Sequence, residues 1–585
     1  MRQEEQGAVG AAPAGSVAHA GGIDRAHRRV IFASSLGTVF EWYDFYLYGS
    51  LSAIISRQFF SGVDETTGFI FALLAFAAGF FVRPFGALVF GRLGDLTGRK
   101  YTFLVTIVIM GSATALVGML PSYAQIGVAA PIALITLRLL QGLALGGEYG
   151  GAATYVAEHA PQGRRGLYTS WIQTTATLGL FMSLLVILAC RTLLGAEAFE
   201  AWGWRVPFLL SIVLLAISVY IRLKLQESPV FQEIKREGRL SKAPLTEAFA
   251  RWGNLKVVLL ALLGATAGQA VVWYAGQFYA LFFLERILQV EARTANLIIA
   301  AALLIGTPFF IVFGALSDRI GRKRIVLAGC LLAAVTYFPI FQALTYFANP
   351  ALDAAVSRAP VTVVADPAEC SFQFDPVGRR LFTSSCDVAK AALARAGIPY
   401  SNERAPAGAV AQVRIGQGDG AIVVPSFAGE RLGRQQFARE SERFSSELRT
   451  VLADAGYPTR ADPGSINYPM VIAICTLLVI YVTMVYGPIA AWLVELFPAH
   501  IRYSSMSLPY HIGNGWFGGF LPVTSFAIVA ATGDIYAGLW YPVGIALLTV
   551  VVGSLFLRET YADEWRTSAQ APGAIGRRAA ASDAE

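Results

Sequence analysis

The chain has little charge for its length. Asp, Glu, Lys and Arg make up only 15% of its 585 residues, whereas a soluble globular protein carries roughly 25%. Hydrophobic residues account for 55%, and the mean hydropathy is +0.54. Because so little polar surface cannot cover a particle that faces water all round, the composition indicates a membrane protein.

Histidine and cysteine are also scarce, with five of each. The sequence shows no nucleophile–base pair and no set of metal ligands, so we expect neither an enzyme nor a metal or other cofactor. The net charge is +7, but no basic stripe is interleaved with exposed aromatics, which argues against nucleic acid as a partner. A channel is disfavoured because no ion-coordinating ring motif is present.

Twelve apolar runs are long enough to cross a bilayer, because a spanning helix needs roughly 20 such residues. The first six cover 30–55, 69–90, 101–120, 132–156, 168–188 and 206–223. The last six cover 257–284, 295–315, 325–347, 468–493, 504–531 and 535–557. The sequence therefore predicts an all-α integral membrane protein with two six-helix halves.

Lys and Arg concentrate in one set of loops, among them the turns that hold Arg99, Lys100, Arg222, Arg322 and Lys323. The positive-inside rule places these loops and both termini in the cytoplasm. The predicted divisions are a disordered tail (1–28), the first half (29–224), a central loop (225–256), helices seven to nine (257–348), an outer insert (349–466), helices ten to twelve (467–557) and a tail (558–585).

The hydrophilic insert at 349–466 reads as a small α/β domain outside the membrane. Strand-like runs at 361–364 and 421–424 alternate with helical runs at 387–396 and 431–455. Cys370 and Cys386 either form a disulfide on an oxidising outer face or are two unpaired cysteines. The insert has no histidine, so an enzymatic role is disfavoured, and we expect decoration in preference to a lid or a partner-binding module.

A short signature occurs twice, as GRLGDLTGRKYTFL at 91–104 and GALSDRIGRKRIVL at 314–327, and seven of the fourteen positions agree. Each copy lies between two apolar runs. A charged turn repeated in this way indicates two related halves that move against each other, which is typical of a transporter.

The two turns resemble the signature loop of the major facilitator superfamily. Further segments resemble its metabolite:H⁺ symporter family: FEWYDFYLYG (40–49), RPFGALVFG (83–91), RLLQGLALGGEYGGA (138–152), WGWRVPF (202–208), QESPVF (226–231) and ELFPAHIR (495–502). The resemblance implies a monomer in the inner membrane, without cofactor, that imports a small carboxylate or zwitterion with protons. Known substrates of the family are α-ketoglutarate, citrate, shikimate, proline and betaine. The long insert departs from the family pattern.

The resemblance makes the repeated turns gates, and the alternative is that they only anchor topology. The gating residues expected in this way are Gly91, Asp95, Gly98, Arg99, Lys100, Asp318, Gly321, Arg322, Lys323, Arg205, Glu495 and Arg502. Arg99 and Lys100 are expected at the cytoplasmic surface. Arg205 is alternatively a plain interfacial anchor beside tryptophans.

Charges within spans carry more information, because a buried ionisable group in lipid is costly unless it is paired or functional. Glu41 and Asp44 lie three residues apart in the first span and are candidate proton sites, unless an arginine pairs with one of them permanently. Arg138 and Glu148 in the fourth span are further candidates. Ten residues separate them, so they cannot touch. Arg138 must find another carboxylate, Glu41 or Asp44, unless it snorkels to the membrane surface.

Arg83 in the second span can form a bidentate fork with a substrate carboxylate, or it is a structural partner of Glu41 or Asp44. Further candidate cavity residues are Tyr46, Gln173, Tyr274, Gln277 and Asn514. Glu158 is expected to pair with Arg164 and Arg165. The fifth span lacks the proline typical of the superfamily's drug antiporters, which favours symport. An exporter, or a sensor that uses the insert as its binding module, stays as the alternative.

Overall fold

The computed structural model describes residues 25–61, 65–372 and 382–561. Most of the two predicted tails therefore lies outside the described part of the chain. Within the first two helices several positions are described for the backbone alone, Glu41 among them.

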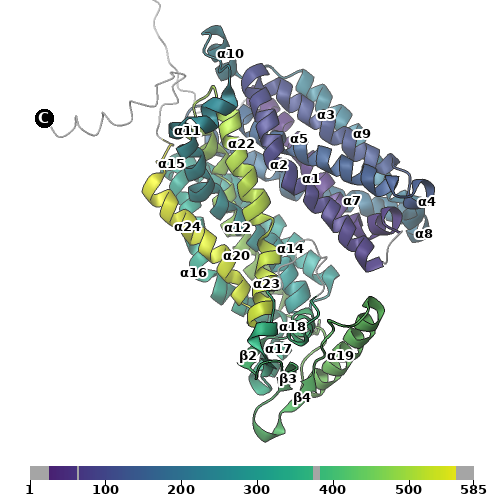
Figure 1. Cartoon of the computed structure of the whole chain (residues 1–585). Helices are drawn as coiled ribbons and strands as arrows, with labels where there is room; N and C mark the ends of the chain where they lie inside the picture. The colour runs from purple at the N-terminus through teal and green to yellow at the C-terminus, as the bar shows by residue number, and fades with distance from the viewer. Residues whose placement is uncertain (1–24, 62–64, 373–381, 562–585) are drawn as a thin grey trace, which may run out of the picture.

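Twelve long helical segments run in a bundle, and they correspond one to one with the predicted spans (Figure 1). Ten of them are long and apolar enough to cross a membrane, and α1 (Arg25–Phe59) and α2 (Glu65–Thr97) complete the set. The other unbroken or singly interrupted segments are α3 (Arg99–Met119), α5 (Ala129–His159), α6 (Arg165–Gln173) with α7 (Thr175–Leu194), α9 (Arg205–Leu223), α14 (Ala292–Gly306) with α15 (Pro308–Ile320), α16 (Arg322–Ala348), α20 (Tyr468–Tyr486) with α21 (Ile489–Leu496), and η9 (Ala537–Leu539) with α24 (Trp540–Phe556).

The seventh and eleventh segments are interrupted by π-helical turns. The seventh consists of α11 (Trp252–Ala261), η3 (Leu262–Thr266), α12 (Ala267–Tyr274), η4 (Ala275–Tyr279), α13 (Ala280–Phe282) and η5 (Phe283–Ile287). The eleventh consists of α22 (Arg502–Ile512), η8 (Gly513–Gly518) and α23 (Leu521–Thr532). A π turn inserts an extra residue and rotates the side chains that follow, and such turns are frequent at functional sites.

Short helices lie in the connections. They are α4 (Tyr123–Ile126), α8 (Ala196–Ala198), η1 (Phe199–Gly203), α10 (Pro229–Arg236) and η2 (Thr246–Ala250). The central loop 225–256 is thus largely helical.

In each copy of the repeated signature the connection between the two helices is a single glycine, shorter than the charged turn that was predicted. Helix α2 continues to Thr97, and Gly98 alone separates it from α3. Gly321 separates α15 from α16 in the same way. The φ angles are 121° at Gly98 and 113° at Gly321, in a region that disfavours residues with a Cβ.

Helices α2 and α5 pack backbone against backbone. A Cβ on Gly86 would collide with the carbonyl of Leu143, and one on Gly146 would collide with the carbonyl of Arg83. Small residues permit this approach where lipid provides no hydrophobic drive for helix association. The packing holds Arg83 on α2 beside the segment of α5 that carries the buried charges.

The insert lies at the end of the bundle opposite α10 (Figure 1). Its elements are α17 (Pro350–Arg358), β1 (Val361–Ala365), η6 (Pro367–Glu369), α18 (Ser385–Ala396), β2 (Tyr400–Arg404), β3 (Gln412–Ile415), η7 (Gly418–Gly420), β4 (Ile422–Pro425) and α19 (Arg434–Asp454). The sheet order is β2-β1-β3-β4; β1 pairs with β2 in parallel and β3 pairs antiparallel with both β1 and β4. The α/β character is as predicted, but β2 and β3 were not predicted, because both are short and polar.

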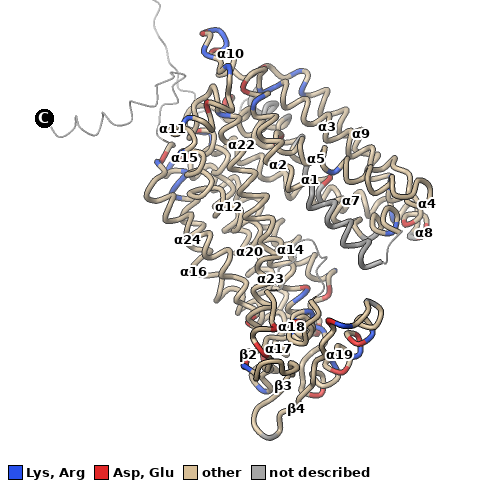
Figure 2. Tube along the Cα trace, viewed as in Figure 1, with Lys and Arg blue, Asp and Glu red and all other residues tan. Residues whose placement is uncertain are grey.

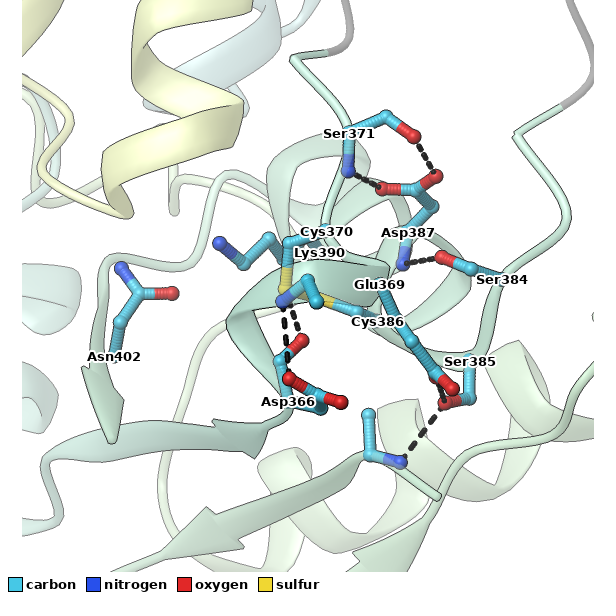
Figure 3. Close-up of a disulfide and its surroundings, with 12 residues drawn as sticks. Asp366, Glu369, Cys370, Ser371, Ser384, Ser385, Cys386, Asp387, Lys390 and Asn402 are labelled. Atoms are coloured by element: carbon cyan, nitrogen blue, oxygen red, sulfur yellow. Dashed lines mark hydrogen bonds between the residues drawn. A yellow bond between two sulfur atoms is a disulfide. The ribbon is translucent and has the colours of Figure 1, made fainter. Parts of the chain in front are cut away.

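A disulfide joins Cys370, which follows η6, to Cys386 in the first turn of α18, with 5.2 Å between the Cα atoms. Figure 3 shows the surrounding bonds: Asp387 accepts from the backbone N–H of Ser371 at 2.8 Å and from its hydroxyl at 2.7 Å, and Ser384 caps α18. These contacts tie the crossover between the parallel strands to the helix that makes it.

The insert docks on the second half through the carbonyl end of α23. Lys390 donates to Ala531 O at 3.0 Å and Asn402 donates to Thr532 O at 2.7 Å, while the hydroxyl of Tyr400 donates to Ala530 O. The last carbonyls of a helix have no partner within the helix, so these side chains satisfy them. Burial lowers the pKa of Lys390, and Asp387 opposes that change.

Candidate functional site

A buried ion pair lies in the middle of the first half. Arg138 on α5 donates to Asp44 Oδ2 on α1 at 2.9 Å, and each side chain is only 5% exposed. The guanidinium also lies 3.7 Å from the ring centre of Tyr48. The predicted partnership across the helix interface is confirmed for Asp44. The snorkelling alternative for Arg138 is wrong because its charge is neutralised within the bundle.

The other oxygen of Asp44 is bound as well. Gln141, one turn further along α5, donates from Nε2 to Asp44 Oδ1 at 3.3 Å and to the hydroxyl of Thr114 at 2.8 Å. Three helices thus meet at this carboxylate: α1, α3 and α5. Glu41, the second predicted proton site, has a side chain outside the described part of the structure.

Glu148 belongs to a separate buried pair. Arg222 of α9 donates to Glu148 Oε1 at 2.7 Å, and the hydroxyl of Thr106 donates to Oε2 at 2.9 Å. As predicted, Glu148 does not contact Arg138. Arg222 was counted as a loop residue from sequence, which is wrong: its side chain is 1% exposed. Its position after a long apolar run concealed that it points inward.

A small cavity lies between the halves. It is lined by Trp42, Phe80, Arg83 and Tyr149 from the first half and by Trp273, Tyr274, Tyr486, Tyr510 and Asn514 from the second. Its volume is about 20 Å³, which suffices for one water molecule. Among the described lining residues Arg83 carries the single charge, and its guanidinium lies 4.2 Å from the ring centre of Phe80. Asp44 pairs with Arg138, and the alternative in which Arg83 is a structural partner of Glu41 falls on a side chain outside the described part of the structure.

Aromatic contacts close this cavity. The rings of Tyr149 and Tyr510 stack at 3.7 Å with 4° between their planes, and the hydroxyls of Tyr486 and Tyr510 lie 2.6 Å apart. Trp42 and Trp273 approach to 5.3 Å across the halves. Several of these rings come from opposite halves, so relative movement of the halves would open or close the cavity.

Of the remaining predicted cavity residues, some line the cavity and others do not. Tyr274 and Asn514 line the cavity, and Asn514 exchanges hydrogen bonds of 3.2 and 3.3 Å with Gln269. Gln173 lies behind it and donates to the hydroxyl of Tyr149 at 2.8 Å. Tyr46, which contacts the ring of Trp42 at 6.0 Å, and Gln277, which is buried in η4, do not line it. Sequence reasoning missed Gln269, Trp273, Tyr486 and Tyr510, since aromatic residues in spans give no signal of direction.

The first signature copy joins the halves. Asp95 accepts from the backbone N–H groups of Tyr503 at 3.2 Å and Ser504 at 2.9 Å, so a carboxylate of the first half binds the N-terminus of α22 in the second. Arg99 lies 3.4 Å from Asp95 and 3.6 Å from Glu158. Arg502 of the second half binds Glu158 at 2.9 Å.

The second copy repeats this arrangement in the opposite direction. Asp318 accepts from the backbone N–H groups of Gly166 and Leu167, both at 2.8 Å, and so binds the N-terminus of α6 in the first half. Arg322 lies 2.8 Å from Asp318 and 3.2 Å from Glu495, and Arg165 lies 3.6 Å from Glu495. We call Asp95, Arg99, Glu158 and Arg502 the first latch, and Asp318, Arg322, Glu495 and Arg165 the second latch.

Next to the two carboxylates of each latch lies a third that was not predicted. Glu227 accepts from the backbone N–H of Arg99 at 3.1 Å and of Lys100 at 3.2 Å. Glu559 accepts from those of Arg322 at 2.8 Å and Lys323 at 3.4 Å. The next residue in each case, Ser228 or Thr560, donates its hydroxyl to the latch glutamate, Glu158 or Glu495. The signal was present in sequence, because LQES at 225–228 matches LRET at 557–560.

Some predictions about the latches are wrong. Arg99 is fully buried, not at the surface, and Arg322 is 1% exposed; Lys100, which donates to Leu223 O at 3.0 Å, is half-buried. Glu158 pairs with Arg99 and Arg502, not with Arg164 and Arg165. A local pairing looked natural because sequence proximity was the sole guide, whereas the folded chain offers partners from the other half.

Arg205 contacts neither latch. Its guanidinium donates to Gly118 O at 3.0 Å and lies 4.6 Å from the ring centre of Trp204, within the same half. These contacts favour the anchoring alternative. Lys, Arg, Asp and Glu residues gather at the latch end of the bundle and along the insert, as the coloured trace of Figure 2 shows. In the described ranges no three His, Cys, Asp or Glu side chains form a metal-binding group.

The chain is similar in sequence to known transport proteins. A family model described as "Sugar (and other) transporter" matches residues 30–246. The shikimate transporter of Escherichia coli K12 is 37% identical over 325 residues, which cover 54% of this chain and 72% of that protein. The proline/betaine transporter of Salmonella typhimurium is 37% identical over 326 residues, which cover 54% of this chain and 64% of that protein.

Solved structures agree on the fold. The major facilitator superfamily proton:xylose symporter XylE, bound to 6-bromo-6-deoxy-D-glucose, aligns with a TM-score of 0.60 over 92% of this chain and 96% of that chain. The sequence identity is 14%, so this similarity concerns the fold alone.

Proposed function

Because the chain belongs to the metabolite:proton symporters of the major facilitator superfamily, we propose that it imports a small carboxylate or zwitterion together with protons by alternating access. The observation that carries the proposal is the buried Asp44–Arg138 pair in the same half as Arg83, which is the single described charge of the cavity lining. The first group offers a titratable carboxylate, and the second offers a cation for the substrate.

Asp44 is the proposed proton carrier. A proton that adds to its carboxylate removes the negative charge that holds Arg138, and the pair loosens. Loss of the proton restores the pair and its electrostatic attraction. Because Asp44 lies on α1 and Arg138 on α5, protonation changes how these helices of the first half pack. That change is the means by which a proton gradient biases the equilibrium between states.

The cavity supports a substrate with one carboxylate. Arg83 can bind it through a bidentate fork, and the surrounding aromatic faces suit either an apolar body or a cationic ammonium group. A dicarboxylate would need a second cation, which the described lining does not contain. At about 20 Å³ the cavity is too small for either a monocarboxylate or a dicarboxylate. We therefore assign this structure to a closed state, in which the aromatic rings must move apart before a substrate can enter.

The latches are the proposed inner gate. Both lie at the end of the bundle that carries α10 and the basic connections, which the positive-inside rule assigns to the cytoplasm, with both termini on that side. In this arrangement the protein is a monomer in the inner membrane, and the insert lies outside. Among the described residues, the hydrogen bonds from the insert to the bundle all reach the second half, so the insert would move with that half. This favours decoration over a lid that spans the two halves.

The test is uptake of labelled betaine, proline, shikimate, α-ketoglutarate and citrate into cells that express the protein, with and without a protonophore. We expect accumulation of a monocarboxylate or zwitterion that the protonophore abolishes. Asp44→Asn should lose accumulation but retain exchange of external for internal substrate, because exchange needs no proton release. Accumulation that ignores the protonophore would contradict symport, and export from loaded vesicles would favour the antiport alternative.

A variant that lacks 360–462 tests the insert. Retained transport is expected for decoration. Loss of transport in a protein that still folds, together with substrate binding by the full chain without uptake, would favour the sensor alternative.

A further inference from the structure

Around Asp44, the buried polar atoms without a hydrogen-bond partner in the described part of the chain are Nε and Nη2 of Arg138, whose guanidinium lies over the ring of Tyr48, and Oε1 of Gln141. Gln141 is 2% exposed, and its Nε2 donates to Asp44 Oδ1 and Thr114 Oγ1. Its Oε1 is buried and has no hydrogen-bond partner among the described residues. A buried carbonyl that makes no bond is costly, so its retention beside the proposed proton carrier calls for an explanation.

The chemistry of the carboxylate determines how the amide is oriented. An ionised carboxylate only accepts hydrogen bonds, so the NH₂ group of Gln141 must face Asp44 in this state. Arg138 occupies Oδ2, so Oδ1 is the oxygen open to a proton. Once a proton adds there, Asp44 becomes neutral and its O–H needs an acceptor. The NH₂ group cannot accept, whereas Oε1 can.

We propose that Gln141 is a positioning residue that follows the protonation state of Asp44: its NH₂ group binds the ionised carboxylate, and its carbonyl binds the protonated acid after the amide turns over. The inference rests on the proposed function of Asp44 as proton carrier. The proton comes from the aqueous phase and adds to Oδ1, and no other bond forms or breaks except hydrogen bonds. Thr114 can serve both orientations, because a hydroxyl accepts as well as donates; at present it donates to Met110 O at 2.9 Å.

Other charged or titratable groups near Asp44 do not replace this role. Arg138 from α5 binds the opposite oxygen, and Tyr48 of α1 lies against the guanidinium. The hydroxyl of Tyr43 on α1 donates to Pro207 O on α9 at 2.7 Å, and Cys190 of α7 lies near Tyr43. Thr114 of α3 does not titrate. Gln141 is therefore the described residue placed to respond to a proton on Oδ1.

The test compares three side chains at position 141 in proteoliposomes. Gln141→Leu keeps the volume but removes donor and acceptor, and Gln141→Glu leaves acceptors beside Asp44 with no donor when ionised. Because a donor to a charged carboxylate is worth more than a bond to a neutral acid, loss of the amide favours the protonated form. We expect the pH at half-maximal proton-driven uptake to move to the alkaline side by about one unit in Gln141→Leu, and further in Gln141→Glu. The substrate KM should change less than twofold.

A second readout keeps the inference testable where a variant transports poorly. The carbonyl stretch of protonated Asp44, identified by its absence in Asp44→Asn, reports the titration by infrared difference spectroscopy on purified protein. Its midpoint should shift as the uptake profile does, whereas Thr114→Val, which leaves the donor to Asp44 intact, should shift it much less. An unchanged midpoint in Gln141→Leu would overturn the inference. Protonophore-insensitive uptake by the unaltered protein would instead overturn the proposed function.

Discussion

The two latches use the same charges but different packing. In both, an aspartate binds a helix N-terminus of the other half, and two arginines meet one buried glutamate. In the first latch Tyr503 of the second half fills a slot formed by Gly94, Gly150 and Gly151, and its hydroxyl donates to Gly147 O at 2.6 Å. A Cβ on Gly94 would collide with the ring.

In the second latch the glycine and the larger residue change places between the two facing helices. Ser317 occupies the position of Gly94, and the glycine is on the opposing helix: a Cβ on Gly166 would collide with the hydroxyl of Ser317 and with Gly314 O. The two latches therefore share the same arrangement of ion pairs and helix N-terminal bonds. The large aromatic contact between the halves, made by Tyr503, belongs to the first latch. Tyr503 is fully buried there, so opening this latch means withdrawing a large ring.

A second difference lies behind the latches. Counted from the matching signature glycines and latch glutamates, Thr106 corresponds to Gly329 and Glu148 corresponds to Val485, and Val485 lies against Gly329. The first half thus has a charged interior near its latch, and the second half an apolar one. We infer that the second half tolerates changes at these positions better.

The largest effect is expected from removing the central carboxylates. Glu158→Gln leaves Arg502 buried without its carboxylate and Arg99 with Asp95 alone, at a cost of about 3–5 kcal/mol to the closed state. Initial uptake should fall roughly tenfold or more, since each 1.4 kcal/mol is a factor of ten in an equilibrium. Glu495→Gln should have a smaller effect, because the ion pair that joins the halves is longer there. Arg165 lies 3.6 Å from Glu495, whereas Arg502 lies 2.9 Å from Glu158. Equal losses of uptake in Glu158→Gln and Glu495→Gln would contradict the expectation that the first latch contributes more to the closed state.

The next largest is expected from Glu148→Gln, which leaves Arg222 buried and charged. We expect a loss of thermal stability of roughly 3 kcal/mol, measured as a lower Tm in detergent. Val485→Ala is the matched change in the second half and should cost less, about 1 kcal/mol. A Tm for Glu148→Gln near that of the unaltered protein would contradict the assigned role of the pair.

Much of this arrangement was accessible from sequence. The apolar runs located all twelve segments, and the repeated GxLxDxxGRK located both latches. The need of a buried arginine for a carboxylate led from Arg138 to Glu41 or Asp44, and the structure pairs it with Asp44. These predictions succeed because they depend on composition and on the cost of unpaired charge, which act wherever the residue lies.

Other features depend on which way a spanning helix faces, and an almost uniformly apolar helix does not reveal that. Arg222 looked like a loop residue, and Trp273 and Tyr510 gave no sign that they face the cavity. The π turns η4 and η8 rotate their neighbours in a way that no periodicity predicts. Glu227 and Glu559 were missed although their segments match, because a four-residue match is visible only once the structure shows what it binds.

A mutation with its own rescue tests the role of Tyr503. Gly94→Ala should displace the ring and lower uptake several-fold, and Tyr503→Ala in the same chain should restore part of the loss by making room. Ser317→Ala, the corresponding site of the second latch, should stay within twofold. If the double variant is as impaired as the product of the two single ones, the ring and the slot do not act together.

The smallest effects are expected at Glu227 and Glu559, which make the same backbone bonds in the two latches. Glu227→Gln and Glu559→Gln each weaken bonds to backbone N–H groups at a helix start, worth about 1 kcal/mol. Unfolding measured by denaturant should show similar losses for the two variants. A loss at one of them alone would mean that the two glutamates are not equivalent.

The central claim is that both latches together hold one end of the bundle closed. Spin labels on Tyr101→Cys in α3 and Ile320→Cys in α15, both exposed positions next to the latches, report the distance between the halves at that end, in a chain whose free cysteines Cys190, Cys330 and Cys475 are replaced. We predict one short distance for intact latches and a second, longer population in Glu158→Gln/Glu495→Gln. An unchanged distribution in that double variant would contradict the account.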